Sequence, residues 1–254
     1  NMMTKEETAY RNYLERTGEK PAPIAAALID MDGVLYDSMP NHAKAWEKVA
    51  AEQGWNFTPE EFYLYEGMTG DGIIRLLMKR EKGRTDVTDE ESRKIYASKV
   101  AHFSTMGPVN QIDGTAGMLN TLRDSGIQRV LVTGSGQNSL IDRLNTDYPG
   151  IFSNELRVTG YDVKKGKPDP EPYLMGLQKA HQQAGSTIVI ENAPLGVRAG
   201  HASGCFTVGI TTGPIPAPVM YENGADIVYP TMRDFAAALP SLIELRKRLS
   251  EKEG

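Results

Sequence analysis

The stretch Ile24-Ala-Ala-Ala-Leu-Ile-Asp-Met-Asp-Gly33 joins a short apolar run to an acidic turn. The run up to Ile29 is typical of a parallel strand that is buried on both faces. Asp30 and Asp32 leave this strand two residues apart, so in extended geometry their side chains point to the same side. Gly33 lets the backbone turn sharply beside them. Two carboxylates this close either bind a cation or share a proton, although acidic turns at strand ends also occur without a function.

Similar apolar runs recur along the chain, with helical segments between most of them. Strands that alternate with helices predict βαβ units and a right-handed crossover. We therefore expect an α/β fold with a doubly wound, mostly parallel, Rossmann-like sheet. The expected strands after the first cover residues 128–132, 156–158, 187–190, 205–210 and 226–228. The expected helices of this part cover residues 114–125, 139–146, 171–183, 195–202 and 232–249, and residues 2–20 form an extra helix.

One region, from about residue 41 to about residue 105, breaks this alternation because it has a helical pattern and no strand. Tyr36-Asp-Ser-Met-Pro40 leads into it, and Met106-Gly-Pro-Val-Asn-Gln-Ile112 leads out. An insert held by two linkers at the carboxyl edge of a sheet can close over a ligand there. We expect a catalytic core at 1–36 and 110–254 and an inserted helical cap domain at 37–109.

Two later segments of the expected core, a strand end and a proline-rich loop, carry polar groups. Val130-Leu-Val-Thr-Gly-Ser-Gly136 ends a strand with the Thr133 hydroxyl and a run of backbone N–H groups. Such a turn at a helix N-terminus can cradle a phosphate oxygen, although Gly-Ser-Gly turns are widespread. Lys167 precedes a loop stiffened by prolines, where a fixed lysine suits the charge of a transferring phosphoryl group. A solvated lysine in a turn is the alternative.

A further strand, 187–190, ends in Glu191 and Asn192. Their oxygen atoms could complete a site for a hard cation together with Asp30 and Asp32. These groups come in order at the carboxyl ends of successive expected strands, which is difficult to obtain by chance. The order therefore predicts one site at one edge of the sheet.

Three phrases carry a resemblance to a known family: Asp30-Met-Asp-Gly-Val-Leu-Tyr-Asp-Ser38, Lys167-Pro-Asp-Pro-Glu-Pro-Tyr173 and Glu191-Asn-Ala-Pro-Leu-Gly-Val-Arg-Ala-Gly200. With the strand-end Thr133 they resemble the four motifs of the haloacid dehalogenase (HAD) superfamily. The helical insert resembles the C1 cap of its β-phosphoglucomutase-like subgroup. The resemblance covers residues 24–238.

The resemblance implies a mechanism. Asp30 would be the nucleophile that forms an aspartyl-phosphate, and Asp32 would protonate the leaving group and then activate water. Mg²⁺ would be held by Asp30, the backbone carbonyl of Asp32, Asn192 and waters, with Glu191 supporting this set. The residues implied to bind the phosphoryl group are Gly33, Thr133, Gly134, Ser135 and Lys167.

The cap departs from the pattern of the mutases. Where they have a loop resembling Lys-Gly-Val-Ser-Arg, this chain has Glu66-Gly-Met-Thr-Gly70. A glycine therefore replaces the arginine that holds a second phosphate, and Glu66 replaces the lysine. A Lys-Asn pair of the mutase core aligns with Gly136 and Gln137. The loss of these cationic contacts argues against mutase activity.

Other cap residues leave alternatives open. His42 and Trp46 stand where mutases have His and Trp, and His42 could serve the substrate or only pack.

Asn192 takes a metal position that is usually Asp. We hypothesise that Glu66 swings in on cap closure and adds a carboxylate to Mg²⁺; otherwise it is an exposed glutamate.

A small polar cavity would favour a compact substrate. Members of the subgroup that share the Glu-Gly-x-Thr-Gly and Glu-Asn-Ala-Pro features look like bacterial inorganic pyrophosphatases. We expect hydrolysis of pyrophosphate or small phosphate esters, with β-phosphoglucomutase or sugar-phosphate phosphatase activity as the alternative. A metal-binding protein without activity is a further alternative, supported by Asn192.

The composition excludes other classes of protein. The chain of 254 residues has a net charge of -5, which gives no basic surface for nucleic acid. Its only cysteine, Cys205, rules out an intrachain disulfide and fits a reducing compartment. No apolar run is long enough to span a membrane, and residues 2–20 lack the apolar stretch of an export signal. We expect a cytoplasmic monomer that acts on a small phosphorylated partner.

Overall fold

The structure is a computed structural model that describes residues 2–253, and its core is a six-stranded parallel sheet. The strand order β3-β2-β1-β4-β5-β6 places the first strand at the centre, between β2 and β4. All neighbouring pairs are parallel, so the expected α/β class is confirmed. The strands are β1 (Ala26–Ile29), β2 (Gln128–Val132), β3 (Arg157–Val158), β4 (Thr187–Glu191), β5 (Phe206–Ile210) and β6 (Ile227–Tyr229).

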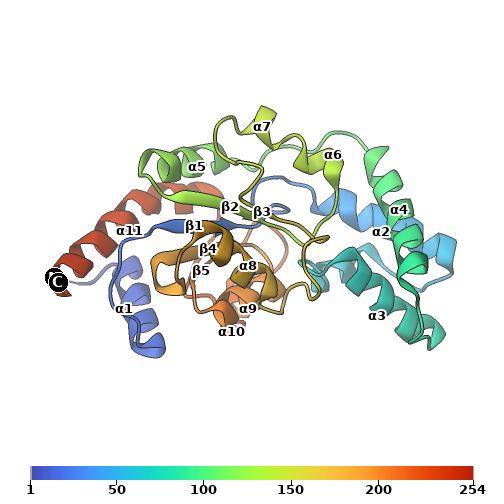
Figure 1. The fold of residues 1–254 in the computed structure, drawn as a ribbon, viewed down its shortest axis with the longest axis horizontal. Helices are drawn as coiled ribbons and strands as arrows, with labels where there is room; N and C mark the ends of the chain where they lie inside the picture. The colour runs from blue at the N-terminus through green and yellow to red at the C-terminus, as the bar shows by residue number, and fades with distance from the viewer. Residues whose placement is uncertain (1, 254) are drawn as a thin grey trace.

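Helices cover both faces of this sheet (Figure 1). Successive side chains of β1 alternate between two hydrophobic clusters, because strand residues point to opposite faces. Ala27 and Ile29 belong to the cluster that includes α5 (Thr115–Asp124) and α11 (Met232–Glu253). Ala26 and Leu28 face the other side, together with residues of α8 (Glu171–Ala180) and α9 (Pro194–Ser203). Burial on both faces explains why the strands are continuous apolar runs.

Some boundaries differ from those expected. The single helix expected at 139–146 is two short helices, α6 (Asn138–Ile141) and α7 (Leu144–Asp147). Helix α8 ends early because His181 adopts the left-handed conformation, with a φ of 53°. Two short helices were not predicted from the sequence. One is α10 (Ala217–Glu222), which lies between prolines and glycines, and the other is the 3₁₀ helix η2 (Ala184–Ser186).

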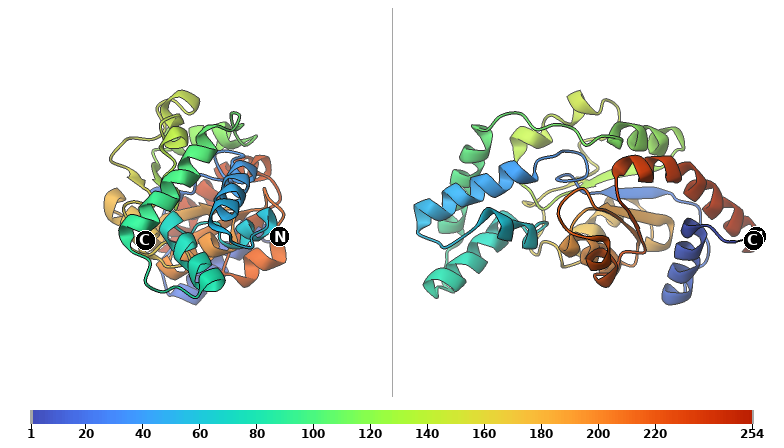
Figure 2. Two further views of the ribbon diagram at one scale, coloured as in Figure 1. Left: turned by 90° about the vertical axis from the view of Figure 1, so that its right-hand side faces the viewer. Right: turned by 180° about the vertical axis from the view of Figure 1, so that it is seen from behind.

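The first and last helices both pack on the core, at the end far from the cap (Figures 1 and 2). Helix α1 (Lys5–Thr17) buries the rings of Tyr10 and Tyr13. In α11, the buried Arg246 donates hydrogen bonds to the backbone oxygens of Ala22 and Gly185, at 3.0 and 2.8 Å. The C-terminal half of α11 therefore packs on the core and is not only a solvated face.

The cap is entirely helical and has a hydrophobic cluster of its own. Two linkers join it to the core and pair with each other, since Asp37 N donates to Asn110 O at 2.8 Å. The expected boundaries between core and cap, 36/37 and 109/110, stay a prediction. The cap elements are α2 (Met39–Gln53), the 3₁₀ helix η1 (Pro59–Leu64), α3 (Gly70–Lys82) and α4 (Asp89–Ser104).

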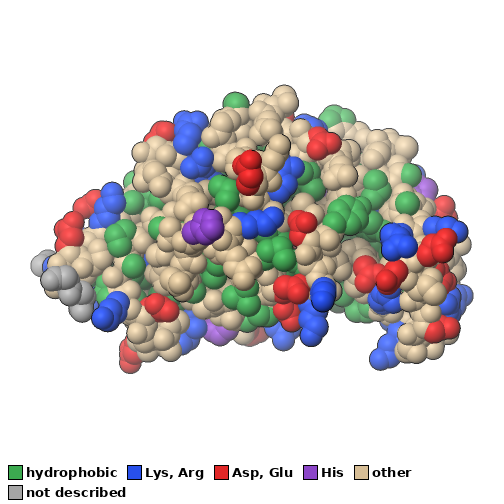
Figure 3. Space-filling view, viewed as in Figure 1, with side chains coloured by type: hydrophobic (Ala, Val, Ile, Leu, Met, Phe, Trp, Pro, Cys, Tyr) green, Lys and Arg blue, Asp and Glu red, His purple; other side chains and the backbone are tan. Residues whose placement is uncertain are grey.

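Acidic and basic side chains are interspersed over the face seen in Figure 3. Within residues 2–253, no helix has both the length and the apolar character needed to cross a bilayer.

Candidate active site

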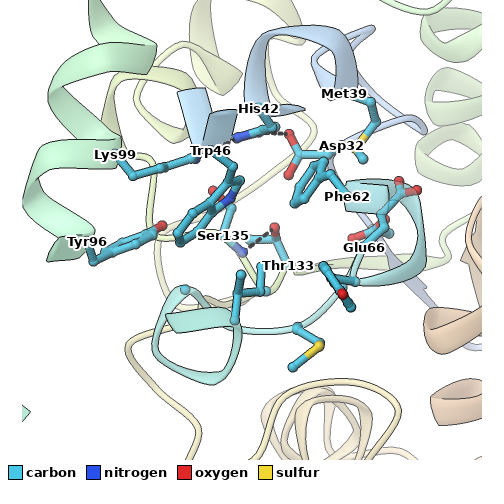
Figure 4. Close-up of a pocket in the computed structure, with 17 residues that line it drawn as sticks. Asp32, Met39, His42, Trp46, Phe62, Glu66, Tyr96, Lys99, Thr133 and Ser135 are labelled. Carbon is cyan, nitrogen blue, oxygen red and sulfur yellow. Dashed lines mark hydrogen bonds and ion pairs between the residues drawn. The ribbon is translucent and has the colours of Figure 1, made fainter. Parts of the chain in front are cut away.

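The expected residues meet at the carboxyl edge of the sheet, under the cap. Figure 4 shows part of this site, with Asp32 and Thr133 from the core and Glu66 from the cap. We call the space between core and cap the inner cavity; its volume is about 40 Å³. The core contributes Asp30, Asp32 and Thr133 to its wall, and the cap contributes His42, Glu66 and Lys99. Gly134 and Ser135 line it as well. Four further expected residues do not line the cavity but contact the lining residues or one another from behind: Gly33, Lys167, Glu191 and Asn192.

Lys167 lies directly behind the core lining residues and is fully buried. Its Nζ donates to Asp30 Oδ1 at 2.8 Å, to Glu191 Oε1 at 2.7 Å and to the backbone oxygen of Val132 at 3.0 Å. Burial alone would lower the pKa of Lys167, but the two carboxylates outweigh it and raise that pKa. The lysine is therefore a fixed cation at the strand ends and not a solvated turn residue.

Asp30 is held between groups of opposite effect. Burial and the nearby Glu191 raise the pKa of Asp30, while Lys167 lowers it, and the net shift is well upward. A positive charge brought to this edge would favour the ionised form that a nucleophile needs.

Glu191 already has partners for both carboxylate oxygens. Its Oε1 accepts from Lys167 and from the Tyr173 hydroxyl at 2.5 Å, and its Oε2 accepts from the backbone N of Asn192 at 3.1 Å. These contacts fit the supporting role that the sequence suggested for Glu191, because no oxygen is left without a protein partner.

Asp32 lies in a chain of hydrogen bonds that begins in the cap. Its Oδ1 accepts from the Ser38 hydroxyl and contacts His42 Nε2 at 2.8 Å. Burial would raise the pKa of Asp32, but His42 and Ser38 outweigh it, so the pKa is lowered. On the other side of the ring, Lys99 Nζ lies 2.7 Å from His42 Nδ1. A neutral His42 satisfies both contacts, with Nδ1 accepting from Lys99 and Nε2–H donating to Asp32.

Lys99 is a functional candidate that the sequence reading missed. It is buried in the cap helix α4, and burial lowers its pKa to about 7. The available signal was its spacing, because it lies four residues from both Ile95 and Phe103 and so interrupts an apolar helix face with a charge. Gln137, at the position of the mutase Asn, accepts from Lys99 at 3.3 Å.

Glu66 is buried and reaches the core, so the exposed alternative is wrong for this closed conformation. Its Oε1 accepts a 2.6 Å hydrogen bond from Asn192 Nδ2. Burial and the neighbouring Asp30 raise the pKa of Glu66. Gly33 is required beside this pair: its φ is +79°, and a Cβ there would lie 1.9 Å from Asn192 Nδ2.

A metal ion can be tested against Asn192. Because Asn192 Nδ2 donates to Glu66, Asn192 Oδ1 points elsewhere. This oxygen is buried and has no hydrogen-bond partner. An unsatisfied buried acceptor costs free energy unless something binds it. Residues 2–253 hold no cluster of three His, Cys, Asp or Glu side chains with metal-binding geometry. The expected set differs in kind, since it uses an amide oxygen and a backbone carbonyl, which suit Mg²⁺.

The cap loop at 66–70 is seated tightly on the core turn at 133–136. A Cβ at Gly134 would lie 2.3 Å from the backbone oxygen of Gly67, and one at Gly67 would lie 3.1 Å from Lys167 Cδ. Ser135 N donates to Thr133 Oγ1 at 3.0 Å, which fixes the hydroxyl at the turn. The turn at 133–136 is thus shaped by the core and covered by the cap loop.

Comparisons with known proteins agree with this architecture. The family described as haloacid dehalogenase-like hydrolase matches residues 24–204. Hexitol phosphatase A of Escherichia coli is 30% identical over 202 residues, which are 79% of this chain and 88% of that protein. The 2-deoxyglucose-6-phosphate phosphatase 1 of Saccharomyces cerevisiae is 30% identical over 217 residues, covering 79% and 85% of the two chains.

A solved structure from Bacteroides vulgatus, provisionally named a beta-phosphoglucomutase, is similar over nearly the whole length. It superposes with a TM-score of 0.90 and is 42% identical in sequence. The match covers 96% of this chain and 98% of that one.

Proposed function

Because this chain belongs to the haloacid dehalogenase-like hydrolase family, we propose that it is a phosphatase for small phosphorylated sugars or polyols. The observation that carries this proposal is Asp30, a buried carboxylate held by Lys167 at the edge of the inner cavity. The names of the two curated relatives support a sugar or hexitol phosphate as substrate. They favour a sugar phosphate, which was the alternative substrate expected from the sequence, over pyrophosphate, which was the first expectation.

The reaction needs two half-steps, and the lining residues can serve both. In the first, a carboxylate oxygen of Asp30 bonds to phosphorus while the bond to the leaving oxygen breaks and Asp32 gives that oxygen a proton. In the second, Asp32 takes a proton from a water that attacks phosphorus, and the bond to Asp30 breaks. The lowered pKa of Asp32 suits the second step, which needs a base, and opposes the first, for which Asp32 has to be protonated when the substrate is bound.

Lys167 and the turn at Thr133 would stabilise the phosphoryl oxygens. The Lys167 ammonium lies 2.8 Å from the proposed nucleophile, so its charge acts directly beside the transferring group. Thr133 and the N–H groups that follow it suit the remaining oxygens. On the cap side, Lys99 and His42 would face the leaving group next to Asp32.

Mg²⁺ is part of the proposal. Asp30, the backbone carbonyl of Asp32 and Asn192 Oδ1 would hold it, and when bound it would offset the repulsion between phosphate and carboxylate. Glu66, hydrogen-bonded to Asn192, would add its negative charge to this set. Glu66→Ala should then raise the Mg²⁺ concentration for half-maximal activity, whereas Glu60→Ala, at an exposed position, should not. An unchanged Mg²⁺ dependence in Glu66→Ala would contradict that role.

Pyrophosphate remains a second candidate because of one observation. The inner cavity is small, about 40 Å³, and Glu66 and Lys99 make its cap side polar. A cavity of this size holds only a few water molecules. A compact leaving group fits the closed state better than a hexose does.

The proposal is tested by a phosphate-release screen with Mg²⁺. It should include a hexitol phosphate, 2-deoxyglucose 6-phosphate, pyrophosphate, and β-glucose 1-phosphate with a bisphosphate primer. We expect the highest kcat/KM with a sugar or polyol phosphate and no formation of glucose 6-phosphate. Preference for pyrophosphate would select the second candidate, isomerisation would select the mutase, and no release from any compound would refute the proposal.

A further inference from the structure

Next to the inner cavity lies a second, larger space that the proposed reaction does not use. We call it the outer groove; its volume is about 770 Å³. It runs between cap and core and is lined by Arg93 of α4 and by Tyr161 and Lys164 of a core loop. The inner cavity and the outer groove share a wall made of Gly70, Tyr96 and Gly134.

Tyr96 is the only member of this shared wall that has a side chain, so its ring is the partition. It lies one helical turn before Lys99, and Figure 4 shows both side chains on the same side of the cavity. The Tyr96 hydroxyl accepts a 2.9 Å hydrogen bond from Gly136 N, which ties the cap helix to the core. The ring also meets Tyr161 edge to face, with centroids 6.2 Å apart.

Gly70 leaves room for this ring. A Cβ at position 70 would lie 2.2 Å from two ring carbons of Tyr96. Gly70 is the first residue of helix α3 and has no positive φ, so its backbone would accept alanine. The glycine is therefore required by the Tyr96 ring and not by the turn.

We propose that Tyr96 sets the size of the leaving group by closing the inner cavity against the outer groove. The proposal rests on the proposed phosphatase function, which places the leaving group beside Asp32, His42 and Lys99. A compact group fits behind the ring. A larger group would have to displace the ring, or else react without full cap closure.

Binding of non-hydrolysable phosphonates tests this without requiring turnover. The probes are methylphosphonate, phenylphosphonate and 1-naphthylphosphonate, titrated by calorimetry in the presence of Mg²⁺. For the unmodified protein we expect affinity to fall about tenfold or more from the smallest to the largest probe. Tyr96→Ala should abolish most of that fall, because the inner cavity and the outer groove become one space. Tyr96→Phe should keep it, because the ring remains.

Two further variants give matched controls. Gly70→Ala should push the ring aside and weaken size selection like Tyr96→Ala, and adding Tyr96→Ala to it should change the profile no further. Tyr161→Ala removes an exposed ring of the outer groove that does not line the inner cavity, and should leave the profile unchanged.

The proposal is overturned if Tyr96→Ala, or Gly70→Ala should the former not fold, keeps the size profile of the unmodified protein. It is also overturned if the unmodified protein binds all three phosphonates equally, or does not bind methylphosphonate. Failure of the proposed function is a different result, namely no phosphate release from any ester in the screen.

Discussion

The core and cap walls of the inner cavity are built differently. In the core, the polar groups at the strand ends form one buried network, in which Lys167 donates three hydrogen bonds and Glu191 accepts three. In the cap wall the groups come from helices and one loop, and they reach the core through single contacts such as that between Glu66 and Asn192. From this difference we expect the core residues to carry out one reaction, while the cap residues determine which substrate is bound. Core substitutions should therefore abolish turnover, and cap substitutions should shift binding.

The largest effect is expected at Asp30. Asp30→Asn removes the nucleophile and should lower kcat by about 10⁴-fold or more, as in other enzymes that lose a covalent catalyst. Steady-state phosphate release measures the change. Asp142→Asn, an exposed site, should keep the activity of the unmodified protein. Substantial activity in Asp30→Asn would contradict the claim that the core residues, unlike the cap residues, are essential for turnover.

Lys167→Met should damage both turnover and stability. Loss of the fixed cation should lower kcat by about 10³-fold. It also leaves two buried carboxylates, Asp30 and Glu191, without their partner, which should lower the free energy of unfolding by about 3–5 kcal/mol. Denaturant unfolding measures the second effect, with the exposed Lys165→Met as the control. Unfolding curves that coincide with that control would mean that the ion pair adds nothing to stability.

In the cap, Lys99 predicts a pH effect on binding. Burial lowers its pKa to about 7, so the ammonium is charged below that pH and neutral above it. An anionic substrate should bind best with the charged form, and KM should rise as the pH increases through about 7. Lys99→Met should raise KM about tenfold at the acidic end and flatten its pH dependence. Lys94→Met, on the exposed side of the same helix, is the matched control, and equal KM profiles in the two variants would contradict the role.

The smallest effect is expected at Tyr173, which supports the core wall from behind. Tyr173→Phe removes one hydrogen bond to the Glu191 carboxylate. Because Lys167 and Asn192 still hold Glu191, we expect a loss of about 2 kcal/mol in stability and little change in kcat. Thermal unfolding and phosphate release would measure the two, with Tyr161→Phe as an exposed control. A large loss of kcat at unchanged stability would give Tyr173 a part in the chemistry.

The core wall could be predicted from the sequence because parallel strands impose it. Asp30, Thr133 and Asn192 each follow an apolar run, and the carboxyl ends of parallel strands lie at one edge. The cap wall could be predicted only in part. Glu66 and His42 were singled out from the resemblance to the mutases, whereas Tyr96 and Lys99 meet the core through tertiary contacts, and the one local sign of Lys99 is that it interrupts an apolar helix face. Their positions depend on how far the cap closes, which no linker sequence specifies.

The central claim is that Asp30 becomes phosphorylated during turnover. The most direct test is a single turnover with the best substrate of the screen, stopped in acid and reduced with borohydride before mass spectrometry. An aspartyl-phosphate at Asp30 is reduced at its acyl carbon, so homoserine should appear at position 30, and it should be absent without substrate. Complete turnover with only unmodified Asp30 at every quench time, or a modified residue elsewhere, would contradict the account.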